Sequence, residues 1–197
     1  GGGIYTLDDE RSVLTGETSD GVLRLLSFCE EHKPPPAVSR YTALIRPYIN
    51  TNRYPGSPEI ERNFLRDNDC LSLIKLHSTE ISILRSAMEG GGKDSRIHIH
   101  YRDAYEAAGA LCPPSIRRGL LIMDPSYELD SDYVQAVSSL EAVHKKWSEG
   151  YKILWYPLLN HRETDISLMK TSLITLCERT QTPYVCSEIL PKSGIQG

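Results

Sequence analysis

GLLIMDPSYE, residues 119–128, is the stretch that predicts how the rest of the chain folds. Residues 119–123 are apolar or small without the polar alternation of a half-exposed strand, so they predict a strand buried on both faces. Asp124 and Pro125 end the strand, because a carboxylate is costly to bury and proline cannot extend a β-ladder. We therefore expect Asp124 to emerge into a crevice at the end of this strand.

Tyr127 follows Asp124 within one turn of chain. A hydrogen-bond acceptor and an aromatic ring, held close together by a proline, suit a flat ligand with an exocyclic amino group, such as adenine or cytosine. The same four residues would also suit a polar turn that simply leaves a strand. The pattern on either side of the stretch bears on this choice.

Strands and helices alternate from residue 70 onward. The hydrophobic pattern predicts strands over residues 70–76, 96–101, 119–124, 151–158 and 184–190, and helices over 78–88, 103–111, 132–148 and 163–180. This alternation predicts an α/β fold with a doubly wound, mostly parallel sheet, in which ligands bind outside the carboxyl ends of the strands. The polar residues at those ends, expected to share one crevice, are Lys75, His77, Asp103, Asp124, Tyr127 and Tyr156.

The first third of the chain departs from this alternation. Residues 1–7, GGGIYTL, predict neither a strand interior nor a good helix, because glycine maximises backbone freedom; they resemble the tail of a loop that approaches a nucleotide. Amphipathic helices are predicted over 19–33 and 37–49, the second interrupted by Pro47, as a small helical insertion spanning 17–53. Ser57 before Pro58 predicts a helix over 57–67 with Ser57 as its N-cap.

Length and composition indicate a single domain covering residues 1–197. The chain is 40% hydrophobic and 24% charged, and its net charge of −4 argues against binding nucleic acid through bulk charge. Arg117-Arg118 and Lys145-Lys146 remain candidate phosphate contacts, or solvated surface. Five cysteines without a C-x-x-C pair favour free thiols in the cytoplasm, and no signal peptide or membrane-length apolar run is present.

His98 and His100 share one face of their predicted strand. With Asp103 nearby they could be imagined as metal ligands, but no third histidine is placed to complete a site. A polar or packed strand face is the favoured interpretation, and no metal is expected.

Three blocks in fixed order carry a family resemblance. They are YPGSPEIERNFLRDNDCLSLIKLH (54–77), LCPPSIRRGLLIMDPSYELDSDY (111–133) and YKILWYPLL (151–159). The chain resembles the class I S-adenosylmethionine-dependent methyltransferases, whose amino-methylating group has Asp/Asn-Pro-Pro-Tyr/Phe after its fourth strand. Within them it is similar to the RlmJ family, the bacterial 23S ribosomal RNA adenine-N6 methyltransferases also described as proteins involved in the use of external DNA. The resemblance implies S-adenosylmethionine as cofactor and 23S rRNA, or alternatively DNA, as substrate.

The resemblance also assigns residues to the cofactor. It implies that Gly1 and Gly3 end the family's glycine-rich cofactor loop, and that Ser57 contacts the cofactor. It further implies that Asp103, with Ala104, reads the cofactor's adenine.

The catalytic residues implied by the resemblance lie in the Asp-Pro-Ser-Tyr turn. Asp124, which also borders the cofactor, would accept one hydrogen of the adenine N6, and the carbonyl of Pro125 would accept the other. Tyr127 would stack on the base, and the base would have to be unpaired or flipped out of its helix.

Two residues depart from the family pattern. Ser126 replaces the second proline, and Lys75 stands where the family has an acidic residue that accepts hydrogen bonds from the cofactor ribose, although lysine has only donors. The family's N-terminal segment near the substrate and its last strands are missing, and the segment between Asn50 and Tyr54 is shorter than in the family. We therefore expect a chain that is incomplete at both ends. The alternative function is a nucleic-acid-binding protein that keeps a methyltransferase fold without catalysis.

Overall fold

The computed structural model describes residues 2–7 and 18–189, so Gly1 lies outside the described residues. The fold is mixed α/β, with helices and small parallel sheets. The chain divides into two compact units, Gly1–Ala104 and Tyr105–Gly197, and each is described by itself. This division leaves the expectation of a single domain as a prediction.

The first unit begins with an antiparallel strand pair. β1 (Ile4–Thr6) pairs with β2 (Arg53–Pro55), with Ile4 opposite Pro55 and Thr6 opposite Arg53. The prediction that residues 1–7 contain no strand was therefore wrong for residues 4–6. The glycines stay outside the strand, and the three residues after them have side chains and a partner strand that satisfy the ladder.

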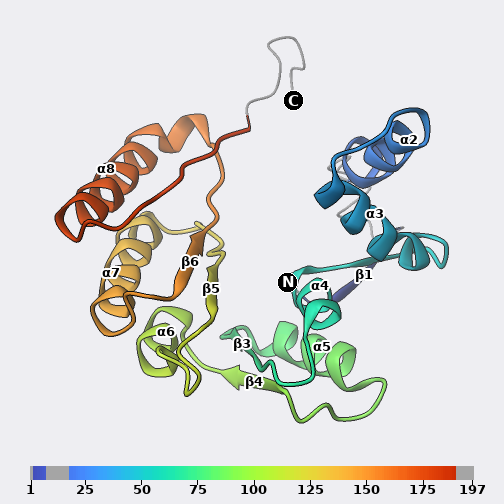
Figure 1. The fold of residues 1–197 in the computed structure, drawn as a ribbon, viewed down its shortest axis with the longest axis horizontal. Coiled ribbons are helices and arrows are strands. Elements are labelled where there is room, and N and C mark those ends of the chain that lie inside the picture. The colour runs from blue at the N-terminus through green and yellow to red at the C-terminus, as the bar shows by residue number, and fades with distance from the viewer. Residues whose placement is uncertain (1, 8–17, 190–197) are drawn as a thin grey trace. The chain divides into compact units, whose positions relative to one another are not determined.

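Helices connect β1 to β2. A π-helical turn, Thr18–Leu23, leads into α2 (Arg24–Glu31), and α3 (Pro36–Ile49) follows. Figure 1 shows α2 and α3 as neighbours, and Arg46 pairs with Glu30 at 3.3 Å between them. The predicted interruption at Pro47 does not occur, since α3 runs through it to Ile49.

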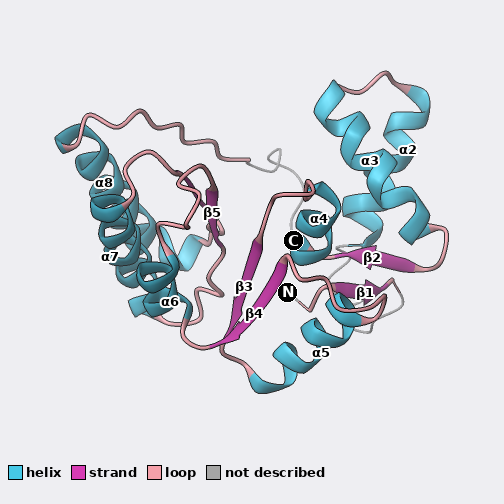
Figure 2. Ribbon diagram, turned by 60° about the horizontal axis from the view of Figure 1, so that its bottom comes forward, coloured by secondary structure: helices cyan, strands magenta, loops and turns pink. Residues whose placement is uncertain are grey.

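The parallel pair of the first unit consists of β3 (Leu71–Lys75) and β4 (Ile97–Tyr101), joined through α5 (Ser78–Glu89). Leu71 lies opposite Ile97 and Lys75 opposite Tyr101, so both strands end at the same edge (Figure 2). Leu84 and Met88 of α5 pack with Leu73 in the core of this unit. These elements agree with the predicted ranges to within one residue.

The second unit repeats this arrangement. β5 (Leu120–Met123) and β6 (Tyr151–Leu154) pair in parallel, with Leu120 opposite Tyr151. The remaining elements are α6 (Ala104–Leu111), α7 (Asp130–Lys146), the 3₁₀ turn η2 (Asn160–Arg162) and α8 (Glu163–Arg179), and α8 lies along α7 (Figure 1).

Trp147 is the largest side chain in the core of the second unit. It is almost fully buried against Met123, Ala136, Leu140 and Val143, and its indole nitrogen donates to the Arg117 carbonyl at 2.6 Å. A Cβ at residue 150 would lie 2.2 Å from the indole ring, so only glycine fits where the chain passes beneath it.

Three predictions for this unit were wrong. The strand predicted over residues 151–158 ends at Leu154. β5 was expected to be buried on both faces, but Leu120 is 52% exposed and Ile122 is 44% exposed. Met123 is buried among the residues of α6 and α7 and Leu121 packs against them, so the alternate residues of the strand are the ones left accessible. Residues 184–189 form no strand, since Val185 and Ile189 are exposed and the segment has no ladder partner among the described residues; Leu190 lies outside them.

We expect Trp147→Ala to lower the free energy of unfolding by about 3–5 kcal/mol, because it removes a buried aromatic ring and leaves a cavity. Trp155→Ala is the control, since that ring is 56% exposed, and it should cost much less. Chemical denaturation followed by circular dichroism measures both. Equal losses would contradict the packing described here.

Candidate functional site

Backbone groups join the glycine turn to the start of α4 (Ser57–Phe64). The N–H of Gly56 donates to the carbonyl of Gly3 at 2.7 Å, and Gly3 has a φ of +95°, which favours glycine. A Cβ on Gly56 would lie 2.8 Å from the Tyr5 ring and 3.1 Å from the Gly3 carbonyl oxygen. The two turns therefore approach as closely as backbone allows.

This contact corrects the expected helix cap. The N-cap of α4 is Gly56, whose carbonyl accepts the N–H groups of Glu59 and Ile60 at 3.0 Å each, and Ser57 is the first helical residue. The sequence favoured Ser57, but the close approach to Gly3 requires glycine at the cap. Ser57 is exposed, so its hydroxyl can serve another purpose at the helix N-terminus.

Lys75 is the last residue of β3, and it forms an ion pair with Glu80 in the first turn of α5. Lys75 Nζ lies 2.5 Å from Glu80 Oε2. Burial alone would lower the pKa of Lys75, but the hydrogen bond and the charge of Glu80 outweigh it and raise the pKa. The same hydrogen bond to Lys75 lowers the pKa of the Glu80 carboxyl. Lys75 replaces the acidic residue of the family pattern, and the carboxylate of Glu80, five residues later, lies beside it.

Asp103 and Ala104 follow the end of β4. Because Lys75 lies opposite Tyr101 in the parallel register, Asp103 emerges at the same edge of the pair as Lys75. Asp103 is half-buried and Ala104, the first residue of α6, is exposed. Five residues of the predicted cofactor site belong to the first unit: Gly3, Ser57, Lys75, Asp103 and Ala104.

A buried carboxylate, Glu59, lies two residues after Ser57, and the sequence pattern did not predict its burial. Glu59 is fully buried, and its Oε1 accepts hydrogen bonds from Tyr48 at 2.5 Å, Arg62 at 2.6 Å and, more weakly, Asn63 at 3.4 Å. Its Oε2 is buried and has no partner in the described chain. Burial, followed by the hydrogen bond to Glu59, raises the pKa of Tyr48.

The Glu59 cluster connects α3 to the start of α4, since Tyr48 belongs to α3 and Glu59 to the first turn of α4. From the sequence, a carboxylate there indicated only a favourable helix start. Its partners come from another helix, so only the folded chain reveals them.

Removing the cation from this cluster should destabilise the first unit. We expect Arg62→Met to lower the free energy of unfolding by about 3 kcal/mol, because it leaves a buried carboxylate without its counter-charge. Arg40→Met, at an exposed position of α3, is the matched control. Urea denaturation compares them, and a loss no larger than the control's would show that the ion pair contributes little.

The Asp-Pro-Ser-Tyr turn belongs to the second unit and starts where β5 ends. Asp124 and Ser126 are exposed and Pro125 is half-buried, so the acceptor groups of Asp124 emerge at the carboxyl end of a parallel strand, as predicted.

Tyr127 anchors this turn. Its ring is only 3% exposed and packs tilted against Tyr133, with ring centroids 4.7 Å apart, while its hydroxyl donates to the Trp155 carbonyl at 3.0 Å. Burial raises the pKa of the Tyr127 phenol. The backbone φ is +53°, a conformation that non-glycine residues rarely adopt and that such packing must hold.

Asp132 secures the far side of the turn. Its Oδ2 accepts the Leu129 N–H at 3.1 Å, and its Oδ1 accepts the Tyr105 hydroxyl at 3.1 Å. These bonds start α7 directly after the turn. Tyr156, also predicted near the site, donates to Glu188 Oε1 at 2.7 Å and so contacts the C-terminal extended segment.

The residues expected in one crevice thus lie in two groups. Lys75, His77 and Asp103 belong to the first unit, and Asp124, Tyr127 and Tyr156 to the second. The shared crevice stays a prediction.

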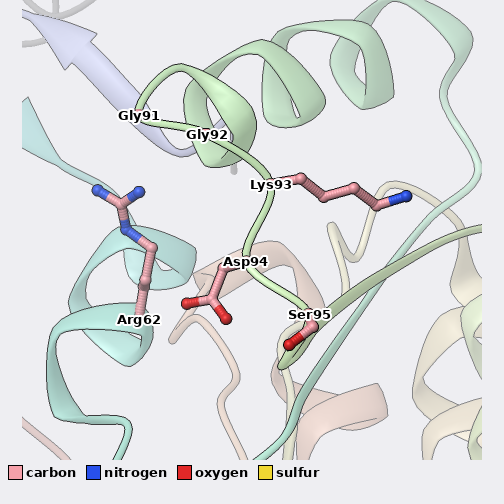
Figure 3. Close-up of a pocket in the computed structure, with 6 residues that line it drawn as sticks. All are labelled: Arg62, Gly91, Gly92, Lys93, Asp94 and Ser95. Atoms are coloured by element: carbon pink, nitrogen blue, oxygen red, sulfur yellow. The ribbon is translucent and has the colours of Figure 1, made fainter.

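A polar cavity of about 470 Å³ in the first unit lies away from the strand ends that were expected to bind a ligand. Figure 3 shows its lining residues, Arg62, Gly91, Gly92, Lys93, Asp94 and Ser95. The loop that forms it precedes β4, so it lies at the amino end of that strand. Asp94 pairs with Arg96 at 2.7 Å, and this hydrogen bond lowers the Asp94 pKa to about 2.

The Asp94–Arg96 pair gives a pH prediction. Because the folded-state pKa of Asp94 lies below its ordinary value of 3.8, the pair stabilises the fold above about pH 4 and loses this contribution as the pH falls through about 2. Arg96→Gln should return the Asp94 pKa toward 3.8 in an NMR titration. An unchanged pKa would contradict this account.

Comparisons with known proteins agree with these features. The model of the family described as ribosomal RNA large subunit methyltransferase D, RlmJ, matches residues 1–181. The chain belongs to the RlmJ family. The resemblance predicted from the three sequence blocks is therefore confirmed.

Two curated relatives of this RlmJ-family chain are both named ribosomal RNA large subunit methyltransferase J. The Escherichia coli (strain K12) protein is 34% identical over 162 residues, which are 81% of this chain and 56% of the relative. The Haemophilus influenzae (strain Rd) protein is 31% identical over 168 residues, 83% of this chain and 58% of the relative. The RlmJ-family chain thus spans a little over half the length of these relatives.

A solved structure has the same fold. The crystal structure of a Legionella pneumophila (Philadelphia 1) protein from family DUF519 superposes with a TM-score of 0.76 at 30% identity, covering 89% of this chain and 63% of the other. Within residues 2–7 and 18–189 of the RlmJ-family chain, no group of three metal-ligating side chains is found, and no helix is long and apolar enough to cross a membrane.

Proposed function

We propose that this protein transfers a methyl group from S-adenosylmethionine to N6 of an adenine in 23S rRNA. The observation that carries the proposal is the exposed Asp124-Pro125 pair at the carboxyl end of β5, anchored by the buried Tyr127. Membership of the RlmJ family and the names of the two relatives support it.

The proposal includes one doubly wound, mostly parallel sheet within a single domain, residues 1–197, with a helical insertion over 17–53. The two parallel pairs, β3–β4 and β5–β6, support it, because each is joined through a helix as in such sheets.

The residues of the first unit fit a nucleoside cofactor chemically. Ser57 offers a hydroxyl at a helix N-terminus, next to the buried Gly3 turn, and Asp103 can accept a hydrogen bond from an adenine amino group. Ala104 and Lys75 would border the same molecule, with Gly1 and Asp124 as further contacts. S-adenosylmethionine, when bound, supplies the electrophilic methyl group on its sulfonium.

Asp124 and Pro125 would perform the chemistry by positioning. The lone pair of an adenine N6 is delocalised into the ring, so the amino group must be turned out of conjugation and pointed at the methyl group. The Asp124 carboxylate would accept a hydrogen bond from one N6–H group, and the Pro125 carbonyl would accept a hydrogen bond from the other. Correct orientation can supply much of the rate enhancement, so the site needs no strong base.

Tyr127 remains a candidate for stacking on the base, worth about 1–3 kcal/mol. Because the Tyr127 ring is buried against Tyr133, the turn would have to move and expose more of the ring before a base could stack on it. Its hydrogen bond to Trp155 supports a second contribution, which is to hold Asp124 and Pro125 in place.

Asp124→Ala should reduce the rate of methyl transfer by about 100-fold or more, since misplacing the adenine amino group that receives the methyl lowers the rate by about that factor. Its cofactor affinity should stay measurable by calorimetry. Transfer of labelled methyl to unmethylated 23S rRNA is the assay, and Glu128→Ala, an exposed neighbouring carboxylate, is the control. A fully active Asp124→Ala protein would refute the catalytic assignment.

The rival proposal is a nucleic-acid-binding protein without catalysis, and Lys75 at the cofactor edge is the observation that favours it. Calorimetry with S-adenosylmethionine separates the two, because an absence of binding at millimolar concentration would favour the rival. Parallel assays on unmethylated rRNA and duplex DNA would distinguish the two substrates.

A further inference from the structure

The end of β3 presents an ion pair in the position where nucleoside-binding sheets present a single acceptor. In doubly wound nucleotide-binding sheets, an acidic residue at the carboxyl end of a parallel strand accepts hydrogen bonds from the ribose hydroxyls. Here the last residue of β3 is Lys75, and lysine has three donors and no acceptor. Lys75 alone cannot bind a ribose in that way.

Glu80 supplies the missing acceptor at the same place. Its Oε2 lies 2.5 Å from Lys75 Nζ, so the carboxylate is held over the carboxyl end of β3 although it belongs to α5. The position in the first turn of α5 also favours a negative charge. The side chains of Lys75 and Glu80 are 28% and 44% exposed, so a ligand can reach both.

We propose that Glu80, held by Lys75, accepts the hydrogen bonds of the cofactor's ribose hydroxyls in this protein. The inference rests on the proposed function, because it assumes that S-adenosylmethionine binds at this edge. A carboxylate has about four lone-pair sites, so the bond to Lys75 leaves acceptor capacity for a ribose hydroxyl. Lys75 acts as a positioning residue.

The charges at this edge agree with the assignment. Lys75 lowers the pKa of Glu80, so the carboxylate stays ionised and acts only as an acceptor at neutral pH. Asp103 follows the neighbouring strand β4, and the proposed function assigns it to the cofactor's adenine. Two other carboxylates of the described first unit are engaged elsewhere, since Glu59 is buried and Asp94 bonds to Arg96.

The alternative is that the pair only stabilises the start of α5. A partly exposed ion pair of this kind contributes little to stability and, in that role alone, does not affect ligand affinity. Cofactor affinity therefore distinguishes the two roles, whereas stability does not.

The experiment is calorimetric titration of the whole protein with S-adenosylmethionine. Glu80→Gln should weaken binding by about 10-fold or more, since the acceptor loses its charge and the ion pair with Lys75 that holds it in place. The control, Glu89→Gln at the exposed far end of the same helix, should bind as the unmodified protein does. The double variant Lys75→Glu/Glu80→Gln should regain affinity, because it places the acceptor directly on β3.

A deoxyribose ligand tests the same contact without changing the protein fold. S-adenosylhomocysteine and its 2′-deoxy and 3′-deoxy analogues are titrated into the unmodified protein and into Glu80→Gln. At least one analogue should lose affinity for the unmodified protein and lose much less for the variant. Two outcomes would overturn the inference and leave the proposed function standing. One is that each deoxy analogue loses as much affinity for Glu80→Gln as it does for the unmodified protein. The other is that Glu80→Gln binds the cofactor as tightly as Glu89→Gln does. If the unmodified protein binds neither ligand, both proposals fail.

Discussion

Parallel pairing of β3 with β4, and of β5 with β6, is the constraint on which the candidate site depends. Two parallel strands can be joined only through a crossover, and here α5 and α7 lie within the two crossovers. The loops that follow the strands then lie at the carboxyl edge of each pair. Lys75 and Asp103 share one such edge, and Asp124 emerges at the other. Within each pair, strand direction places the residues that follow the strands at one edge, even where they are distant in sequence.

Both units use buried polar contacts to fix the turns at these edges. The Gly3–Gly56 backbone bond and the Glu59 cluster fix the start of α4, and the Tyr127–Trp155 bond fixes the turn after β5. Each contact connects segments that are far apart in sequence. An unmade bond at a buried group costs about 1–3 kcal/mol, so these contacts resist local opening where a ligand would approach.

Lys75 illustrates how a departure from a family pattern can be resolved by its neighbour in space. Considered alone, the lysine removes an acceptor from the proposed cofactor edge and favours a protein without catalysis. The ion pair with Glu80 returns a carboxylate to that edge from the next helix. At the proposed site, the single negative group of the family pattern is thereby replaced by a paired positive and negative group, whose carboxylate can still accept a hydrogen bond.

The sequence by itself determined the order of strands and helices between residues 70 and 180, the family, and the exposed position of Asp124 after β5, because periodicity, proline and a costly carboxylate act locally. It did not determine where β6 ends, since the predicted strand 151–158 stops at Leu154. Only the tertiary structure decided the cap at Gly56, the accessible residues of β5, the partners of Glu59, the burial of Tyr127 and the pairing of Lys75 with Glu80. Each of these depends on atoms brought together by another element, and the pattern of a single segment carries no information about which neighbours it will meet.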